Sequence, residues 1–137
     1  VRLLLGRVRD ALRLGGQVVL DGTAAPRFVE FTDARHEGIE EATDFWAERP
    51  YEGVHEVWTY PQHRLVLDRY TITKDGRTLE FWNWMHCLTV DEVRAEVESV
   101  GFDVVEVTGD VAGAPFDPGA PTFAVRAVRT GRGPGTR

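Results

Sequence analysis

Residues 12–21, which read LRLGGQVVLD, decide how this chain is expected to fold. They close a segment, residues 4–12, in which apolar side chains recur at helical spacing. Gly15 and Gly16 then end the helix, because glycine takes the left-handed conformation that helix C-termini favour. The apolar run at residues 17–21 lacks alternation, which is typical of a strand buried on both faces in a parallel sheet. We therefore expect a helix, a tight turn and a central strand with a parallel neighbour on each side.

An aromatic antiparallel meander is expected downstream of this strand. Its three strands are residues 54–60, 65–73 and 78–88. Asp75-Gly76 separates the last two strands and is the strongest hairpin signal in the chain. Upstream of the meander the periodicity is poor, although residues 37–46 could hold one helix that Pro50 would end.

The C-terminal part of the chain predicts a helix followed by a β-hairpin. Thr89 and Glu92 form a capping-box pattern that begins the helix, and Gly101 closes it. The hairpin strands are residues 102–107 and 122–128, joined by a Gly/Pro-rich loop at residues 109–121. Loops of this length without regular structure are uncommon and often functional.

This order of elements resembles the C-terminal half of a class I S-adenosylmethionine-dependent methyltransferase. Residues 12–21 resemble the late helix, Gly-Gly turn and fifth strand of that family, residues 88–105 its last helix and sixth strand, and residues 109–129 its closing hairpin. The meander resembles the hairpin that several small-molecule methyltransferases insert as a substrate cover.

The resemblance implies an α/β fold that is the C-terminal part of a Rossmann-like sheet. It would consist of a helix and strand, an inserted antiparallel meander, a second helix and a closing β-hairpin. Residues 1–129 would form a partial methyltransferase domain, with residues 54–88 as the inserted substrate cover. Residues 130–137 are expected to be a flexible tail.

The cofactor side of the family pattern is missing from this sequence. The family holds S-adenosylmethionine at a Gly-rich turn after its first strand, with an acidic residue at the end of the second. Here residues 131–135 are glycine-rich but lie too near the end for a helix to follow, and residues 109–113 lie between two strands. We therefore assign no cofactor-binding residue and expect the chain alone to be inactive and not to bind S-adenosylmethionine.

An aromatic cluster and one histidine are the first candidate site residues. Strand alternation puts Trp82, Trp84 and His86 on one face of the third meander strand. The resemblance assigns Trp58, Tyr60, Trp82 and Trp84 as walls for a small-molecule methyl acceptor, and His86 as the base that takes its proton. The alternatives are that the rings only cover the core of the meander and that His86 is structural.

Two further residues complete the predicted site. Asp21 follows the apolar strand, and ligands of open α/β sheets bind at the carboxyl ends of strands. It could instead cap the loop at Gly22 or Thr23. Phe116 is assigned as a substrate contact from the long hairpin loop.

Composition and charge exclude several classes of partner and site. The chain carries 16 basic and 22 acidic residues, a net charge of -6 that argues against nucleic acid or an anionic membrane as partner. Cys87 is the single cysteine, so no disulfide framework is possible. The four histidines lack paired ligand spacing, so no metal site is expected. A cytoplasmic location is the resulting expectation.

Two other functions remain open beside the methyltransferase interpretation. The 137 residues could form a self-contained α+β module that binds a small ligand, or a dimeric scaffold without catalysis. Because an apolar strand with an unpaired edge needs a neighbouring strand, we expect self-association or a complementary N-terminal half. The element order makes the chain look like a little over half of a larger domain, and valine at position 1 suggests truncation or processing.

Overall fold

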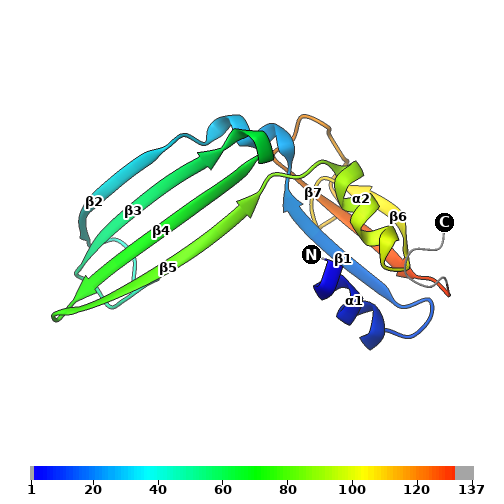
Figure 1. Cartoon of the computed structure of the whole chain (residues 1–137), viewed down its shortest axis with the longest axis horizontal. Coiled ribbons are helices and arrows are strands. Elements are labelled where there is room, and N and C mark those ends of the chain that lie inside the picture. The colour runs from blue at the N-terminus through cyan, green and yellow to red at the C-terminus, as the bar shows by residue number, and fades with distance from the viewer. Residues whose placement is uncertain (1, 132–137) are drawn as a thin grey trace. The chain divides into compact units, whose positions relative to one another are not determined.

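The computed structural model describes residues 2–131, which have an α/β fold with two antiparallel sheets. The chain divides into two compact units (Figure 1). The first unit contains the residues up to 27 and from 87 onward, and the second contains residues 28–86. Within the described residues no helix is long and apolar enough to cross a membrane.

The first unit combines a three-stranded sheet with the α-helices. Its elements are α1 (Arg2–Ala11), β1 (Gln17–Thr23), α2 (Val90–Ser99), β6 (Phe102–Thr108) and β7 (Thr122–Arg129). The strand order is β1-β7-β6, and β7 pairs antiparallel with both neighbours. The predicted closing hairpin is therefore present, with the long loop between β6 and β7.

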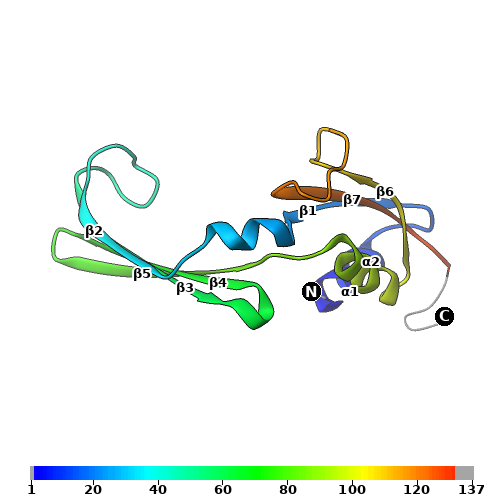
Figure 2. The same cartoon turned by 90° about the horizontal axis from the view of Figure 1, so that it is seen from above.

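The core of the first unit lies where the two helices meet one face of this sheet. Figure 2 shows α1 and α2 on the same side of β1, β7 and β6. Leu5 of α1, Val97 of α2 and Phe102 of β6 are buried together, and Val18 and Leu20 of β1 pack against them. Burial of such side chains stabilises the unit by roughly 2 kcal/mol each.

The prediction that the apolar strand is buried on both faces with parallel neighbours is wrong. β1 pairs antiparallel with β7, and its exposure alternates along the strand. Val18 and Leu20 face the helices, whereas Val19 is 53% exposed. In the described part of the chain the helices cover one face only, so the run behaves as an alternating strand despite its continuous apolar sequence.

Several local turn predictions are confirmed. Thr89 and Glu92 form a complete capping box at the start of α2, with the Glu92 carboxylate accepting from the Thr89 amide at 2.8 Å. Gly101 follows α2 with φ +94°, and Gly15 has φ +76°. α1 ends at Ala11, so a short turn separates the helix from the glycine pair.

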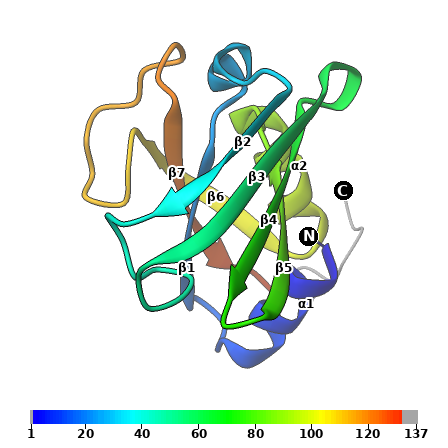
Figure 3. The same ribbon diagram turned by 90° about the vertical axis from the view of Figure 1, so that its left-hand side faces the viewer.

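The second unit is a four-stranded antiparallel sheet in chain order (Figure 3). Its strands are β2 (Ala34–Glu40), β3 (Tyr51–Tyr60), β4 (Leu65–Lys74) and β5 (Arg77–His86). The short 3₁₀ helices are η1 (Ala25–Glu30), which spans the boundary between the units, and η2 (Pro61–His63), which links β3 and β4. Asp75-Gly76 forms the predicted two-residue turn, with φ +50° and +73°.

Two predictions about the start of this sheet are wrong. Residues 37–46 form no helix, because Ala34–Glu40 pairs along β3 and its backbone groups are satisfied by a strand partner. The inserted meander therefore has four strands and begins before residue 54. A helix prediction rested on local spacing, and the long-range pairing with β3 overrides it.

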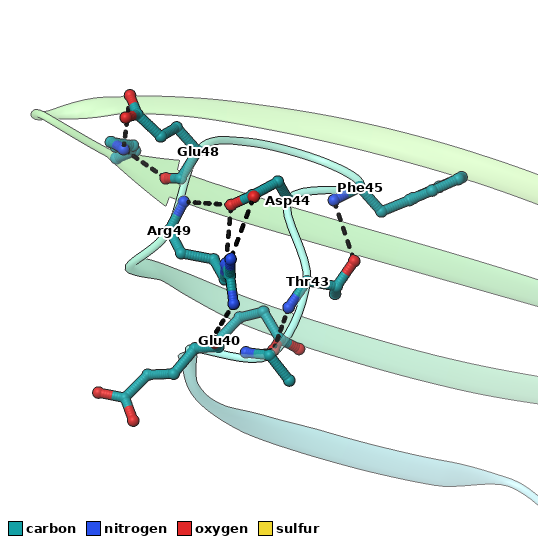
Figure 4. Close-up of polar contacts among 9 residues, drawn as sticks. Glu40, Thr43, Asp44, Phe45, Glu48 and Arg49 are labelled. Carbon is teal, nitrogen blue, oxygen red and sulfur yellow. Dashed lines mark hydrogen bonds and ion pairs between the residues drawn. The ribbon is translucent and has the colours of Figure 1, made fainter.

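Residues 41–50 form a loop that is tied by its own polar contacts (Figure 4). Glu40 accepts hydrogen bonds from the backbone amides of Ala42 and Thr43. The Asp44 carboxylate pairs with Arg49 at 2.8 Å and also accepts from its backbone amide. These contacts shape the loop that carries Trp46.

Candidate functional site

The register of the second sheet brings five predicted site residues to one face. Across β3, β4 and β5, one row of paired residues is Trp58–Leu67–Trp84. The next row is Tyr60–Leu65–His86. We call Trp58, Tyr60, Trp82, Trp84 and His86 the aromatic face. The exposed fractions of Tyr60, Trp82 and Trp84 are 39%, 52% and 58%, so these rings are available to a partner.

The rings of the aromatic face contact one another in pairs. Trp58 and Trp82 are stacked with centroids 6.3 Å apart, and Tyr60 lies 5.6 Å from Trp84. The guanidinium of Arg69 lies 5.6 Å from the Trp58 ring and 5.3 Å from the Trp82 ring. Both distances are within the range of cation–π attraction, so Arg69 holds the two rings in place.

A carboxylate in turn holds Arg69. Glu56 accepts a hydrogen bond from Nε of Arg69 at 2.8 Å and another from Arg35 at 2.9 Å. The hydrogen bonds from Arg69, aided by Arg35, lower the pKa of the Glu56 carboxyl below its ordinary value of 4.5. An ionised Glu56 thus fixes the cation at the centre of the aromatic face.

His86 ends β5 at the border of the aromatic face. Its side chain is exposed, and three residues separate it from the start of α2. An exposed imidazole can accept a proton from a hydroxyl or amine brought to it. Cys87, the next residue, is fully buried, as expected for a small hydrophobic side chain.

The opposite face of the same sheet contains a histidine–aspartate pair that sequence reasoning missed. Nε2 of His55 lies 2.8 Å from Oδ1 of Asp68, and the Asp68 side chain is buried. The His55 ring stacks on Tyr70 with centroids 4.2 Å apart and an interplanar angle of 6°. Burial, together with the Asp68 charge, raises the pKa of the Tyr70 hydroxyl.

A cavity of about 330 Å³ lies beside this pair. We call it the glycine-floored cavity, because Gly38 of β2 and Gly53 of β3 pair directly and leave a gap between two rows of larger side chains. His55 and Asp68 are 13 positions apart in the sequence, and no local pattern links them. Only the β3–β4 pairing, which was predicted without its exact register, would have revealed them as neighbours.

The other two predicted residues belong to the first unit. Phe116 lines a cavity of about 470 Å³ together with Leu88 and Phe123. Asp21 does not line that cavity, and it lies two residues inside β1, which continues to Thr23, instead of at the strand end. Its exposed side chain faces away from the helix-covered core.

The described residues do not fit S-adenosylmethionine in the manner of the family. No Gly-rich turn in residues 2–131 joins a strand to a following α-helix. At the start of α2 the amides of Thr89 and Glu92 are already satisfied by each other's side chains. A Cβ on Gly109 would lie 2.8 Å from the Pro115 carbonyl oxygen, so this glycine serves loop packing. The glycine-rich residues 132–135 lie outside the described residues.

Comparison with solved structures identifies the fold. The CcbJ methyltransferase of Streptomyces caelestis matches 92% of this chain with a TM-score of 0.64 and 14% identity. An S-adenosylmethionine-dependent methyltransferase of Clostridium acetobutylicum matches 95% with a TM-score of 0.70 and 8% identity. The fold is that of part of a class I methyltransferase.

A third match agrees with the first two. An S-adenosylmethionine-bound amino pentose methyltransferase of Micromonospora echinaspora matches 94% of the chain, with a TM-score of 0.50 and 18% identity. This chain covers 48%, 51% and 50% of the three structures, about half the length of each. No protein-family model and no curated protein sequence matches the chain.

Proposed function

We propose that this chain is the acceptor-binding half of an S-adenosylmethionine-dependent methyltransferase that acts on a small molecule. The observation that carries the proposal is the fold: more than nine-tenths of the chain matches methyltransferases, over about half of their length. In this proposal β1, β6 and β7 correspond to the fifth, sixth and seventh strands of the family sheet. The second unit is then the inserted substrate cover.

The proposed acceptor lies against the aromatic face. Trp58, Tyr60, Trp82 and Trp84 offer exposed or half-buried rings on which a flat or apolar molecule can stack. His86 takes the proton from the acceptor hydroxyl or amine. One of the matched structures is an amino pentose methyltransferase, which supports a small-molecule acceptor here.

The first unit supplies the remaining proposed contacts. Phe116 contributes an apolar wall from its cavity, and Asp21 offers a carboxylate on the exposed side of β1. A complementary half is proposed to pair with the outer edge of β1 and to hold the cofactor, because the described residues do not form the family's cofactor turn.

Calorimetry tests whether the cofactor binds this chain or only the complementary half. The 137-residue chain titrated with S-adenosylmethionine should release no binding heat, and methyl transfer to a small-molecule acceptor should appear only when the complementary half is supplied. Micromolar binding by the chain alone would contradict the proposal. A complementary half that binds the cofactor but yields no transfer to hydroxyl or amine acceptors would contradict the acceptor role.

A further inference from the structure

The glycine-floored cavity is built by the side-chain rows of the second sheet. One row runs His36–His55–Tyr70 across β2, β3 and β4, and the next row runs Gly38–Gly53–Ile72. Because the two glycines carry no side chain, the rows on either side stand apart. Tyr51 and Glu40 pair in the row beyond and form the far wall.

Trp46 lines the cavity from the loop at residues 41–50. Its ring lies 4.9 Å from Tyr70 and is stacked 4.5 Å from Phe81, so the loop is anchored on the sheet. The polar ties between Asp44 and Arg49 hold the loop in this shape (Figure 4). The space is therefore an open pocket bordered by groups on the strands and the loop, and its volume is that of a small-molecule site.

His55 lines this space, and its neutral ring would supply a hydrogen-bond acceptor. A carboxylate can only accept, so Nε2 of His55 donates its hydrogen to Asp68. In the neutral imidazole Nδ1 then carries the lone pair. Stacking on Tyr70 and the contact of Asn83 with Asp68 at 3.5 Å hold the pair in this orientation. A molecule that binds beside the neutral ring can donate an N–H or O–H to Nδ1.

The charges around the cavity select among such molecules. The residues that line it include Glu40 and contain no lysine or arginine. The rings of Trp46, Tyr51 and Tyr70 also line it, and aromatic faces attract cations. Glu37 also borders the cavity, but alternation along β2 turns its side chain to the opposite face, where it pairs with Arg35. The Glu40 carboxylate accepts hydrogen bonds from the loop amides. The Glu40 carboxylate and the aromatic rings favour a cation over an anion.

We propose that the glycine-floored cavity binds a small organic amine, whose ammonium group donates to Nδ1 of His55 and lies against the aromatic rings. The site is on the face of the sheet opposite the aromatic face, so the proposal does not rest on the methyltransferase function. His55 acts here as a binding residue, and Asp68 orients it.

An NMR titration of the full chain tests the class of ligand. Phenethylamine should bind saturably at one site and perturb the Trp46 indole resonance, whereas phenylacetate, its anionic counterpart, should bind at least about tenfold more weakly. Absence of saturable phenethylamine binding at millimolar concentration would overturn the proposal, as would equal binding of phenylacetate.

Variants that fill the cavity test its location. A Cβ at Gly53 meets only Tyr51 at 3.9 Å and one at Gly38 meets nothing within 4 Å, so Gly53→Val and Gly38→Val should fold. Each should weaken phenethylamine binding at least about tenfold by occupying the space. Gly6→Val, the same substitution in α1 of the first unit, should leave binding unchanged. Unaltered affinity in both cavity variants would show that the amine binds elsewhere.

A third substitution tests whether His55 is the hydrogen-bond acceptor for the amine. His55→Phe keeps a flat ring over Tyr70 but removes both nitrogens, so affinity should fall about fivefold or more while the thermal unfolding transition stays cooperative. If this variant does not fold, the Gly53→Val and Gly38→Val results decide the proposal. A folded His55→Phe chain with full affinity would eliminate His55 as the acceptor.

Discussion

Arg69 is the residue around which the aromatic face is organised. Its guanidinium lies within cation–π distance of the Trp58 and Trp82 rings and donates hydrogen bonds to the ionised Glu56. Glu56 and Trp58 belong to β3, Arg69 to β4 and Trp82 to β5. The Glu56 carboxylate also binds Arg35 of β2. One carboxylate thus connects three strands, which makes its protonation state matter for the whole sheet.

Acid should weaken the second unit through Glu56. Its pKa is lowered in the folded state, so its contribution to stability is present above pH 4.5 and is lost as the pH falls through the lowered value. Glu56→Gln should therefore be less stable than the parent at about pH 7, and the difference should shrink at about pH 3. Denaturant unfolding at the two pH values measures this, and a difference that stays constant would refute the assignment.

His86 is predicted to act on the acceptor proton in the complete enzyme. His86→Ala should lower kcat by about a hundredfold, with little change in KM. His63→Ala, which alters another exposed histidine of the second unit, is the matched control. Unchanged turnover in His86→Ala would make the residue structural.

At the scale of elements, the β4–β5 hairpin depends on a turn that only particular residues accept. Gly76 has φ +73°, and a Cβ there would meet nothing within 4 Å, so any cost of substitution is conformational. Gly76→Ala should destabilise the chain by about 1 kcal/mol. Gly6→Ala, within α1, should instead stabilise it by about 0.5–1 kcal/mol. Chemical denaturation distinguishes the two, and equal shifts in the same direction would contradict this account.

Alternation and turn chemistry made part of the second sheet predictable from the sequence. Trp82, Trp84 and His86 share a face because they alternate along a single strand, and Asp75-Gly76 determines where that strand begins. β2 could not be predicted in this way. Ala34–Glu40 contains a glycine and little apolar character, and it becomes a strand only because β3 offers hydrogen-bond partners.

At the scale of the whole molecule, the edge of β1 is the feature that governs association. In the described residues β1 pairs with β7 on one side only, and a strand edge presents unpaired amide and carbonyl groups. We predict that the isolated chain self-associates through this edge and that Val19→Lys, which places a charge on the exposed strand, reduces the association. Light scattering over a range of concentrations measures it; a monomer throughout would refute the prediction.

The sequence by itself determined what depends on neighbours along the chain. The capping box of Thr89 and Glu92, the turn at Asp75-Gly76 and the shared face of Trp82 and Trp84 all follow from local backbone preferences. The resemblance to half of a methyltransferase also rested on such elements in their order, and the solved structures support it at the level of the fold.

Tertiary structure alone decided which strands pair and what the pairing brings together. β1 joins β7 although more than 90 residues separate them, and β2 joins β3 across a loop. The His55–Asp68 pair and the glycine-floored cavity exist only in that register. The physical reason is that strand pairing is set by burial and hydrogen bonding between distant segments, energies that no local window of sequence contains.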